Sequence, residues 1–328
     1  MLSSNKNLQI LSSVLFLVCA VLTLVIIIED NDGSNKIVHD SNNGYFFTNP
    51  ILDCEGVKPS SEGSISRKEI SDKINSLKER YDISFISVYF RDLNNGPWVG
   101  VNEKEEFIPA SLLKVPLVIS LFRYAQDNRD IFDKKIFLTK DYADNSYPQN
   151  NDSASVQMKE GGEYSLLDVA ERTLRYSDNL GVNLILDNVP SNYLEELYLT
   201  LGGEGISSNV RVKDYASFFR LLYNSSYLDR NLSEKLLNIL SKTEYKDGIV
   251  AGIPKDIVVA HKFGEYTVDE AFDGGVSLST TEAQLHDCGI VYLPERPYIL
   301  CVMTRGKDIS LQEKAIAEIS KMIFEEVK

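Results

Sequence analysis

The sequence contains few of the residues that soft metal sites and nucleic-acid surfaces need. It has 3 His and 4 Cys among 328 residues, so we do not expect a zinc site. Lys and Arg total 34 against 48 Asp and Glu, and the net charge of −14 argues against nucleic-acid binding. Hydrophobic residues still make up 43% and charged residues 25%, which is typical of a globular chain with one large core or two smaller ones.

One apolar run without charges, residues 10–28, is long enough to cross a bilayer as a helix, at about 1.5 Å per residue. Lys6 precedes this run and Glu29 follows it, so the positive-inside rule places the rest of the chain outside the cytoplasm. We therefore predict that residues 1–28 form a cytoplasmic tip and a single-pass anchor in the cell membrane. A cleaved signal peptide is the alternative, although no small-x-small cleavage site follows Ile28.

Residues 29–64 are rich in Asn, Ser, Asp and Gly and show little periodicity, which predicts a flexible tether. An oxidising exterior would permit disulfides. Cys54 has no obvious partner, and Cys288 and Cys301 fall on strands that we expect to be neighbours. Free thiols packed as small hydrophobic residues are one interpretation, and the sequence leaves the disulfide state open.

Hydrophobic periodicity divides residues 65–328 into an α+β pattern. We expect an amphipathic helix over 67–81, a hairpin of strands 83–92 and 98–101 around Asn94-Asn95-Gly96, and a closing helix over 311–326. Further strands are expected over 257–262, 271–279, 285–293 and 298–305, and helices over 112–125, 165–176, 193–201, 212–223 and 233–240. This order predicts an α/β sandwich, in which a five-stranded antiparallel sheet (65–110 and 247–328) with flanking terminal helices receives an all-helical insertion (111–246).

The first motif with chemical meaning is Ser111-Leu112-Leu113-Lys114, at the start of a predicted helix. A spacing of three residues places Lys114 one turn from Ser111 on the same helix face. A serine is a weak nucleophile until a base takes its proton, and an amine can be that base only if its pKa falls well below about 10.4. Alone the motif is weak, because Ser3-Ser4-Asn5-Lys6 matches it as well.

Two further motifs follow along the chain. Ser177-Asp178-Asn179 comes after a predicted helix, where its hydroxyl could relay a proton and its amide could bind a carbonyl, although such residues also cap helices. His261-Lys262-Phe263-Gly264-Glu265 closes the predicted strand 257–262, where a cation followed by glycine suits recognition of a carboxylate. An exposed strand end is the simpler interpretation of this last motif.

In this order, the three motifs resemble the SxxK, SDN and KTG set of class A β-lactamases and penicillin-binding proteins. The stretches SDNLGVNLIL, AGIPKDIVVAHKFGE and HDCGIVYL are similar to class A β-lactamase sequence, and the resemblance covers roughly residues 67–328. It implies a β-lactamase/transpeptidase-like fold and a monomeric ectodomain without a cofactor or metal. It also implies that the substrate is a β-lactam or a cell-wall peptide.

The resemblance implies a role for each matching residue. Ser111 would be the acylated nucleophile, Lys114 its base, and Ser177 the group that passes a proton to the leaving nitrogen. Lys262 would steady Ser177, attract the substrate carboxylate and lower the pKa of Lys114 by repulsion. The substrate-binding residues would be Asn179, which holds a side-chain amide, together with Phe263, Gly264 and Glu265. The backbone N–H groups of Ser111 and Glu265 would form the oxyanion hole.

Two departures from the family pattern affect these expectations. Phe263 replaces the usual Thr or Ser, so a hydroxyl donor for a carboxylate is missing, and the ring would stack on a substrate or point away. The loop that carries the deacylating glutamate is shortened and has no ExxLN pattern. Glu204 is the nearest substitute, because Glu195 and Glu196 fall on a predicted solvated helix face.

The sequence therefore favours a β-lactam hydrolase with an acyl-enzyme at Ser111. A D-alanyl-D-alanine carboxypeptidase, or a penicillin-binding protein or sensor with slow deacylation, is the alternative, and a degenerate scaffold is a weaker one. A Ser-His-Asp triad through His261 or His286 is disfavoured, because no GxSxG motif is present.

Overall fold

The structure is a computed structural model that describes residues 44–49, 65–94, 97–140, 142, 157–202, 209–267 and 282–328. The predicted membrane helix over 10–28 and the predicted strand over 271–279 lie outside these residues. Within the described ranges, no helix combines the length and the apolar character needed to cross a bilayer.

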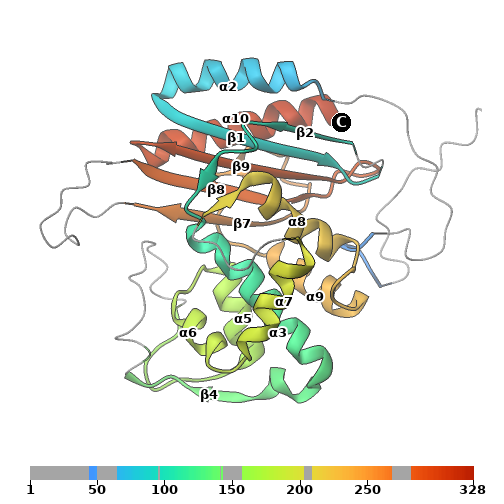
Figure 1. The fold of residues 1–328 in the computed structure, drawn as a ribbon, viewed down its shortest axis with the longest axis vertical. Helices are drawn as coiled ribbons and strands as arrows, with labels where there is room; N and C mark the ends of the chain where they lie inside the picture. The colour runs from blue at the N-terminus through green and yellow to red at the C-terminus, as the bar shows by residue number, and fades with distance from the viewer. Residues whose placement is uncertain are drawn as a thin grey trace, which may run out of the picture.

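A five-stranded antiparallel sheet, in the order β2-β1-β9-β8-β7, forms the centre of the molecule (Figure 1). The predicted antiparallel sheet built from both ends of the folded region is confirmed. The hairpin is observed with the predicted bounds. The strands are β1 Ile83–Asp92, β2 Trp98–Val101, β7 Val259–Tyr266, β8 Ala283–Val291 and β9 Tyr298–Gly306.

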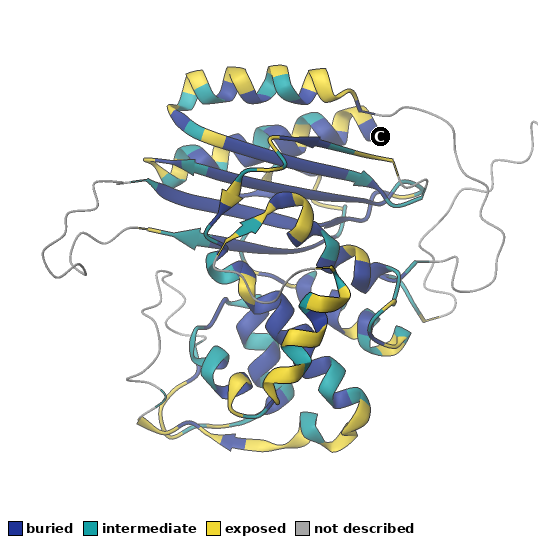
Figure 2. Ribbon diagram, viewed as in Figure 1, coloured by how far each residue is buried: buried dark blue, intermediate teal, exposed yellow. Residues whose placement is uncertain are grey.

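Two terminal helices, α2 (Arg67–Tyr81) and α10 (Ile309–Val327), cover one face of the sheet. Ser66 begins α2 with a capping box, and Asp308 caps α10 by accepting from Ser310 and Leu311. Both helices bury one side against the sheet and expose the other, as Figure 2 shows. The buried side is mostly apolar. The first apolar core therefore lies between these helices and the sheet.

The helical part of the chain lies on the other side, beside the β7 edge (Figure 1). Its helices pack around a second core, which also contains side chains from the sheet face opposite α2 and α10. Short two-stranded pairs, β3–β6 and β4–β5, brace this part. The elements are β3 Glu106–Phe107, η3 Ala110–Leu113, α3 Lys114–Asp127, η4 Arg129–Asp133, β4 Lys135–Phe137, β5 Glu163–Ser165, α5 Leu166–Arg175, α6 Leu180–Leu186, α7 Ser191–Thr200, β6 Val210–Arg211, α8 Val212–Tyr223, α9 Arg230–Leu240 and η5 Ile249–Gly252.

The strand expected over 257–262 is longer than predicted, and this changes the place of one motif. β7 continues to Tyr266, because its pairing with β8 runs without a break from Val259↔Val291 to Tyr266↔Gln284. Lys262 and Gly264 therefore lie inside the strand, and the expected position at a strand end is wrong.

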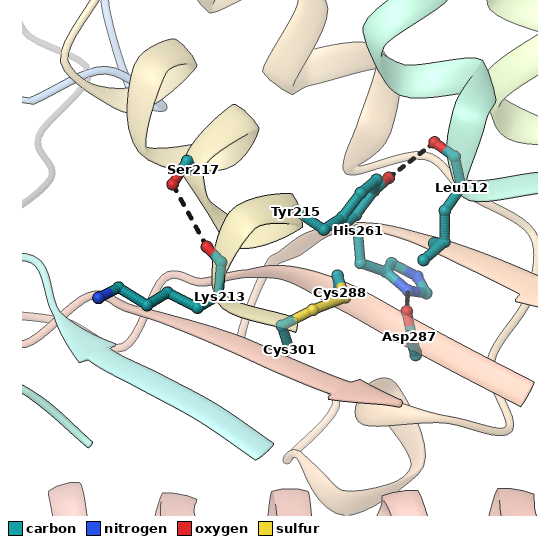
Figure 3. Close-up of a disulfide and its surroundings, with 8 residues drawn as sticks. All are labelled: Leu112, Lys213, Tyr215, Ser217, His261, Asp287, Cys288 and Cys301. Atoms are coloured by element: carbon teal, nitrogen blue, oxygen red, sulfur yellow. Dashed lines mark hydrogen bonds and ion pairs between the residues drawn. A yellow bond between two sulfur atoms is a disulfide. The ribbon is translucent and has the colours of Figure 1, made fainter. Parts of the chain in front are cut away.

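The interpretation of Cys288 and Cys301 as free thiols is also wrong. The two residues are directly opposite each other on β8 and β9, and they form a disulfide whose half-cystines are both fully buried (Figure 3). The prediction that they lie on neighbouring strands is confirmed. Their pairing depends on the register of the two strands, which periodicity does not specify.

Part of the segment expected to be a tether contacts the folded part. Glu234 of α9 accepts hydrogen bonds from the backbone N–H groups of Phe46, Phe47 and Thr48. The ring of Phe47 packs against Tyr292 at 5.2 Å between centroids, and the Tyr292 hydroxyl donates to the Phe47 carbonyl at 2.9 Å. Composition alone did not predict this contact.

Candidate active site

The predicted nucleophile lies at the point where the η3 turn passes into α3. Ser111 is in η3, and Lys114 is the first residue of α3. The preceding Ala110 has φ +49°, a left-handed conformation that non-glycine residues rarely adopt and that clusters at functional sites. The buried hydroxyl of Tyr215 donates to the Leu112 carbonyl at 2.9 Å and fixes the turn from α8.

The Lys114 amine joins the predicted residues to one another. Lys114 is 4% exposed, and its Nζ lies 2.9 Å from Ser111 Oγ, at the distance of a hydrogen bond. The same nitrogen lies 2.6 Å from the Ser177 carbonyl oxygen, 3.1 Å from Ser177 Oγ and 2.5 Å from Asn179 Oδ1. The geometry thus connects Lys114 to Ser111, Ser177 and Asn179 without an intervening water.

Ser177 occupies the short connection between α5 and α6, again with a left-handed backbone (φ +57°). The neighbouring Asp178 holds this connection, because its two carboxylate oxygens accept from the N–H groups of Met158 (2.9 Å) and Leu180 (3.0 Å). Asp178 therefore caps the start of α6, whereas Ser177 and Asn179 contact Lys114.

Lys262 reaches Ser177 from the sheet. Its Nζ donates to Ser177 Oγ at 3.0 Å and to the Phe263 carbonyl at 2.8 Å. Gly264 allows β7 to come this close, because a Cβ at this position would lie 2.7 Å from the Pro109 carbonyl oxygen and 3.1 Å from the Leu112 nitrogen. β7 is also the edge strand of the sheet, so its outer side faces the turn that carries Ser111.

Burial sets the protonation of both lysines. Burial lowers the pKa of Lys114 to about 7, against a smaller opposing effect of the Asp178 carboxylate. Burial and then the charge of Lys114 hold the pKa of Lys262 well below its usual range, while Asp287 opposes the shift. Desolvation is therefore the main cause of the low pKa of Lys114, and the expected repulsion between Lys114 and Lys262, which is mutual, adds to it.

The Phe263 ring was expected either to stack on a substrate or to point away. It does neither, because it is packed inside the protein. The side chain is 5% exposed and stacks on Tyr245, with ring centroids 4.1 Å apart and planes 18° apart. The Lys262 Nζ lies 4.2 Å from the centroid of the Phe263 ring. The next residue but one, Glu265, is partly buried, and burial raises the pKa of its carboxyl.

His261 and His286 are buried beside the residues of the site. His261 Nδ1 lies 2.8 Å from Asp287 Oδ1 (Figure 3). Asp287 Oδ2 accepts from the Ile249 N–H at 2.8 Å. His286 contacts the Ile108 carbonyl at 2.9 Å through Nε2, and burial lowers its pKa to about 4. The sequence analysis did not predict the His261–Asp287 pair. The signal that could have indicated it is that His261 and Asp287 fall within strands that are otherwise apolar.

The shortened connection after α7 is where a deacylating group was expected. Glu195 and Glu196 are exposed on α7, as predicted for a solvated face. Glu204 lies outside the described residues. Within the described residues, no group of three or more His, Cys, Asp or Glu side chains is placed to bind a metal ion.

The Ser111 hydroxyl is bonded to an amine with a pKa of about 7, and the Ser177 hydroxyl is held between two lysines, an arrangement that suits activation of a serine by a lysine base. The model of the β-lactamase enzyme family matches residues 69–327, and the chain belongs to this family. A β-lactamase of Bacillus licheniformis is 23% identical over 281 residues, which cover 79% of this chain and 84% of the relative.

Solved structures show the same fold. The structure of PBP-A superposes with a TM-score of 0.65 at 20% identity and covers 81% of this chain and 98% of its own. A β-lactamase from Chitinophaga pinensis gives 0.65 at 21%, with 79% and 100% covered. A variant of PBP-A, solved as its acyl-enzyme complex with penicillin G, gives 0.63 at 22%, with 79% and 96% covered.

Proposed function

We propose that this chain is a serine hydrolase that opens β-lactam amides through an acyl-enzyme at Ser111. The observation that supports the proposal most directly is the chain of contacts Ser111–Lys114–Ser177–Lys262, each between 2.9 and 3.1 Å. The relatives named β-lactamase and the neighbour solved with penicillin G support the substrate class.

In the proposed reaction, neutral Lys114 takes the proton of Ser111 as Oγ attacks the β-lactam carbonyl carbon. The backbone N–H groups of Ser111 and Glu265 stabilise the oxyanion, an effect that reaches a few kcal/mol per donor. The carbonyl–nitrogen bond then breaks, and the nitrogen takes a proton from Ser177 Oγ, which Lys114 and Lys262 replenish. Asn179 holds the amide of the acyl side chain.

A second candidate is a penicillin-binding protein or sensor with slow deacylation. Glu195 and Glu196 are exposed, and both oxygens of Asp178 are bonded to backbone N–H groups, so none of these three carboxylates is free to activate water beside Ser111. Loss of an acid–base contribution slows hydrolysis of the ester by about 10²–10⁴-fold. The acyl-enzyme would then persist after rapid acylation.

We further propose that residues 10–28 anchor the protein in the cell membrane with the monomeric catalytic domain outside the cytoplasm. The basis is the apolar run between Lys6 and Glu29. Protease protection of the domain in intact cells, compared with permeabilised cells, tests this orientation. Digestion of the domain only after permeabilisation would contradict it.

The catalytic proposal is tested by intact-mass spectrometry of the full-length chain after mixing with a penicillin, followed for an hour. A mass increase by one penicillin that decays with release of hydrolysed product is expected for a β-lactamase. A lasting adduct supports the penicillin-binding variant.

Ser111→Ala removes the nucleophile and should abolish the adduct. Ser217→Ala is the matched control, because Ser217 Oγ bonds only within α8, to the Lys213 carbonyl at 3.3 Å, and should leave labelling unchanged (Figure 3). Absence of any adduct in a folded wild-type chain would contradict both candidates.

A further inference from the structure

We propose that the disulfide between Cys288 and Cys301 positions Lys262 against Ser177, so that the rate of acylation at Ser111 depends on it. The inference rests on the proposed function, because it names a positioning group for the same reaction. No residue of the proposed mechanism lies on β8 or β9, so these two strands act on the site only through the side chains and strands that they contact.

Lys262 and the two cysteines form one row across the sheet. Lys262 of β7 lies directly opposite Cys288 of β8, and Cys288 lies directly opposite Cys301 of β9. Directly opposite residues of antiparallel strands carry their side chains on the same face, with Cβ atoms about 4.5–5.5 Å apart. The disulfide is therefore the cross-strand neighbour of Lys262 on the face that meets the helical part, where both cysteines belong to the second core.

The place of the Lys262 backbone depends on β8, because β7 is the edge strand. Among the described strands, β7 pairs with β8 alone, and the disulfide joins β8 to β9. The Lys262 Nζ has to stay within hydrogen-bond distance of Ser177 Oγ, which lies 3.0 Å away on the helical part. A misplacement of about 1 Å can lower a reaction rate by about 10²-fold. A small shift of β8 is therefore enough to affect the site.

The disulfide is enclosed by packed side chains. Both cysteines and Lys262 are fully buried, and Tyr215 of α8, which is 1% exposed, lies on the same side of the sheet. Figure 3 shows Tyr215 among the residues around the two sulfur atoms. A close-packed interior has low compressibility and transmits a displacement to its neighbours. Loss of the covalent link should therefore displace Lys262 relative to Ser177.

A second route from the disulfide to the site passes through Tyr215. Its hydroxyl donates to the Leu112 carbonyl at 2.9 Å and so supports the turn that carries Ser111 (Figure 3). The two routes differ in their effect on Lys114. Lys262 and Lys114 repel each other, whereas Tyr215 has no charge at neutral pH, because burial raises its pKa well above 10. The pH profile of acylation therefore distinguishes a shift of Lys262 from a shift of the turn.

The test replaces both cysteines with alanine in the full-length chain and measures acylation by a saturating penicillin with intact-mass spectrometry. We expect the rate of the folded variant to fall by about tenfold to 10²-fold. The midpoint of its pH profile should rise above about 7, because burial and repulsion by Lys262, which hold the pKa of Lys114 down, both weaken.

Two results of this experiment overturn the inference. A rate within about twofold of the wild type would show that the disulfide only stabilises the fold. A lower rate with an unchanged midpoint would assign the loss to the turn and not to Lys262. A wild-type chain that does not react with penicillin is a different result, because it overturns the proposed function itself.

Val302→Ala is the matched control. Val302 follows Cys301 on β9, is fully buried, and belongs to the core on the other face of the sheet. Its truncation removes as many heavy atoms as the loss of the two sulfurs, so it also destabilises the sheet. Its acylation rate should stay within about twofold of the wild type, with the same midpoint.

Reduction of the wild-type chain tests the inference without a substitution, and it serves where the alanine variant does not fold. The chain is refolded from urea with a trialkylphosphine. The phosphine and one water convert the disulfide to two thiols and leave the phosphine oxide. Alkylation followed by mass measurement confirms that Cys288 and Cys301 are reduced. We expect the same fall in rate and the same rise of the midpoint, and equal rates for the oxidised and reduced chains would overturn the inference.

Discussion

The two faces of the central sheet bury different kinds of side chain. The back face, under α2 and α10, is filled by aliphatic side chains such as Ile74, Ile316 and Ile319. Its buried polar group Gln312 is bonded on both ends, to the Leu285 N–H and to the carbonyls of Ala283 and Gly306. The side that meets the helical part instead buries the ionisable groups Lys114, Lys262 and Asp178. The alternation of side chains along β7 and β8 places His261 and Asp287 on the back face, with Val259 and Leu285.

Burial of a charge costs free energy unless the group is paired and hydrogen-bonded. The back face limits this cost to the His261–Asp287 pair, in which the two groups are bonded to each other, and its other buried side chains are mostly apolar and serve stability. On the side that carries Ser111, the burial of Lys114 costs free energy. The same burial lowers the pKa of Lys114 to about 7, a value that an exposed lysine would not have. The apolar core that stabilises the fold and the buried amine of the site thus lie on opposite sides of one sheet.

The largest effect is expected for Lys114→Met, which removes the amine and leaves an unbranched side chain one atom shorter. We expect acylation by a penicillin to fall about 10²–10⁴-fold, the usual contribution of a general base. The free energy of unfolding should fall by no more than about 3 kcal/mol, because relief of the burial of the amine offsets the hydrogen bonds that Ser111, Ser177 and Asn179 lose. Stopped-flow acylation and urea unfolding measure the two effects.

Lys213→Met is the control for this change. Lys213 is exposed on α8, with Nζ 4.1 Å from the Trp98 ring centroid, and its loss should leave acylation unchanged. A Lys114→Met chain that acylates at the wild-type rate would remove Lys114 from the role of base.

Ile319→Ala, on the back face, should affect stability and leave acylation nearly unchanged. Ile319 is fully buried in the apolar core between α10 and the sheet, so its truncation should lower the free energy of unfolding by about 2–5 kcal/mol. The acylation rate of the folded fraction should stay within a factor of about two, because the site is across the sheet. Urea unfolding and acylation below the unfolding midpoint test both parts. A large loss of rate in the folded state would show that the two sides are coupled.

The pH dependence of acylation should depend on the side of the sheet that carries Lys114 and not on the back face. Because Lys114 acts in its neutral form and its pKa is about 7, the acylation rate should rise about tenfold per pH unit below 7 and level off above it. The wild-type chain and Ile319→Ala should share this profile, since the back face does not titrate with the site. A rate independent of pH between about 5.5 and 8 would contradict the assignment.

Local signals predicted the elements that local chemistry determines. The amphipathic spacing over 67–81 and the Asn94-Asn95-Gly96 turn predicted α2, β1 and β2 with the observed bounds. The resemblance in three motifs led to Ser111, Lys114, Ser177, Asn179 and Lys262, which the structure brings together.

The features that sequence reasoning missed depend on register and on distant neighbours. The Cys288–Cys301 disulfide requires a particular pairing of β8 with β9. The His261–Asp287 pair and the Tyr245–Phe263 stack each join residues far apart in the chain. Whether Phe263 faces a substrate or another ring cannot be decided without knowing where Tyr245 lies. Desolvation of Lys114 likewise follows from packing, which no motif records.

The close fit of Gly264 against Pro109 has a consequence for solubility. An outer strand with free backbone groups is a template on which a strand of another molecule can add. Here the turn before Ser111 lies against that outer side of β7, and at the opposite side of the sheet the four residues of β2 offer little length for such an addition. The turn that carries the nucleophile thus also protects the sheet from intermolecular pairing, and a change that loosens it should promote aggregation as well as inactivation.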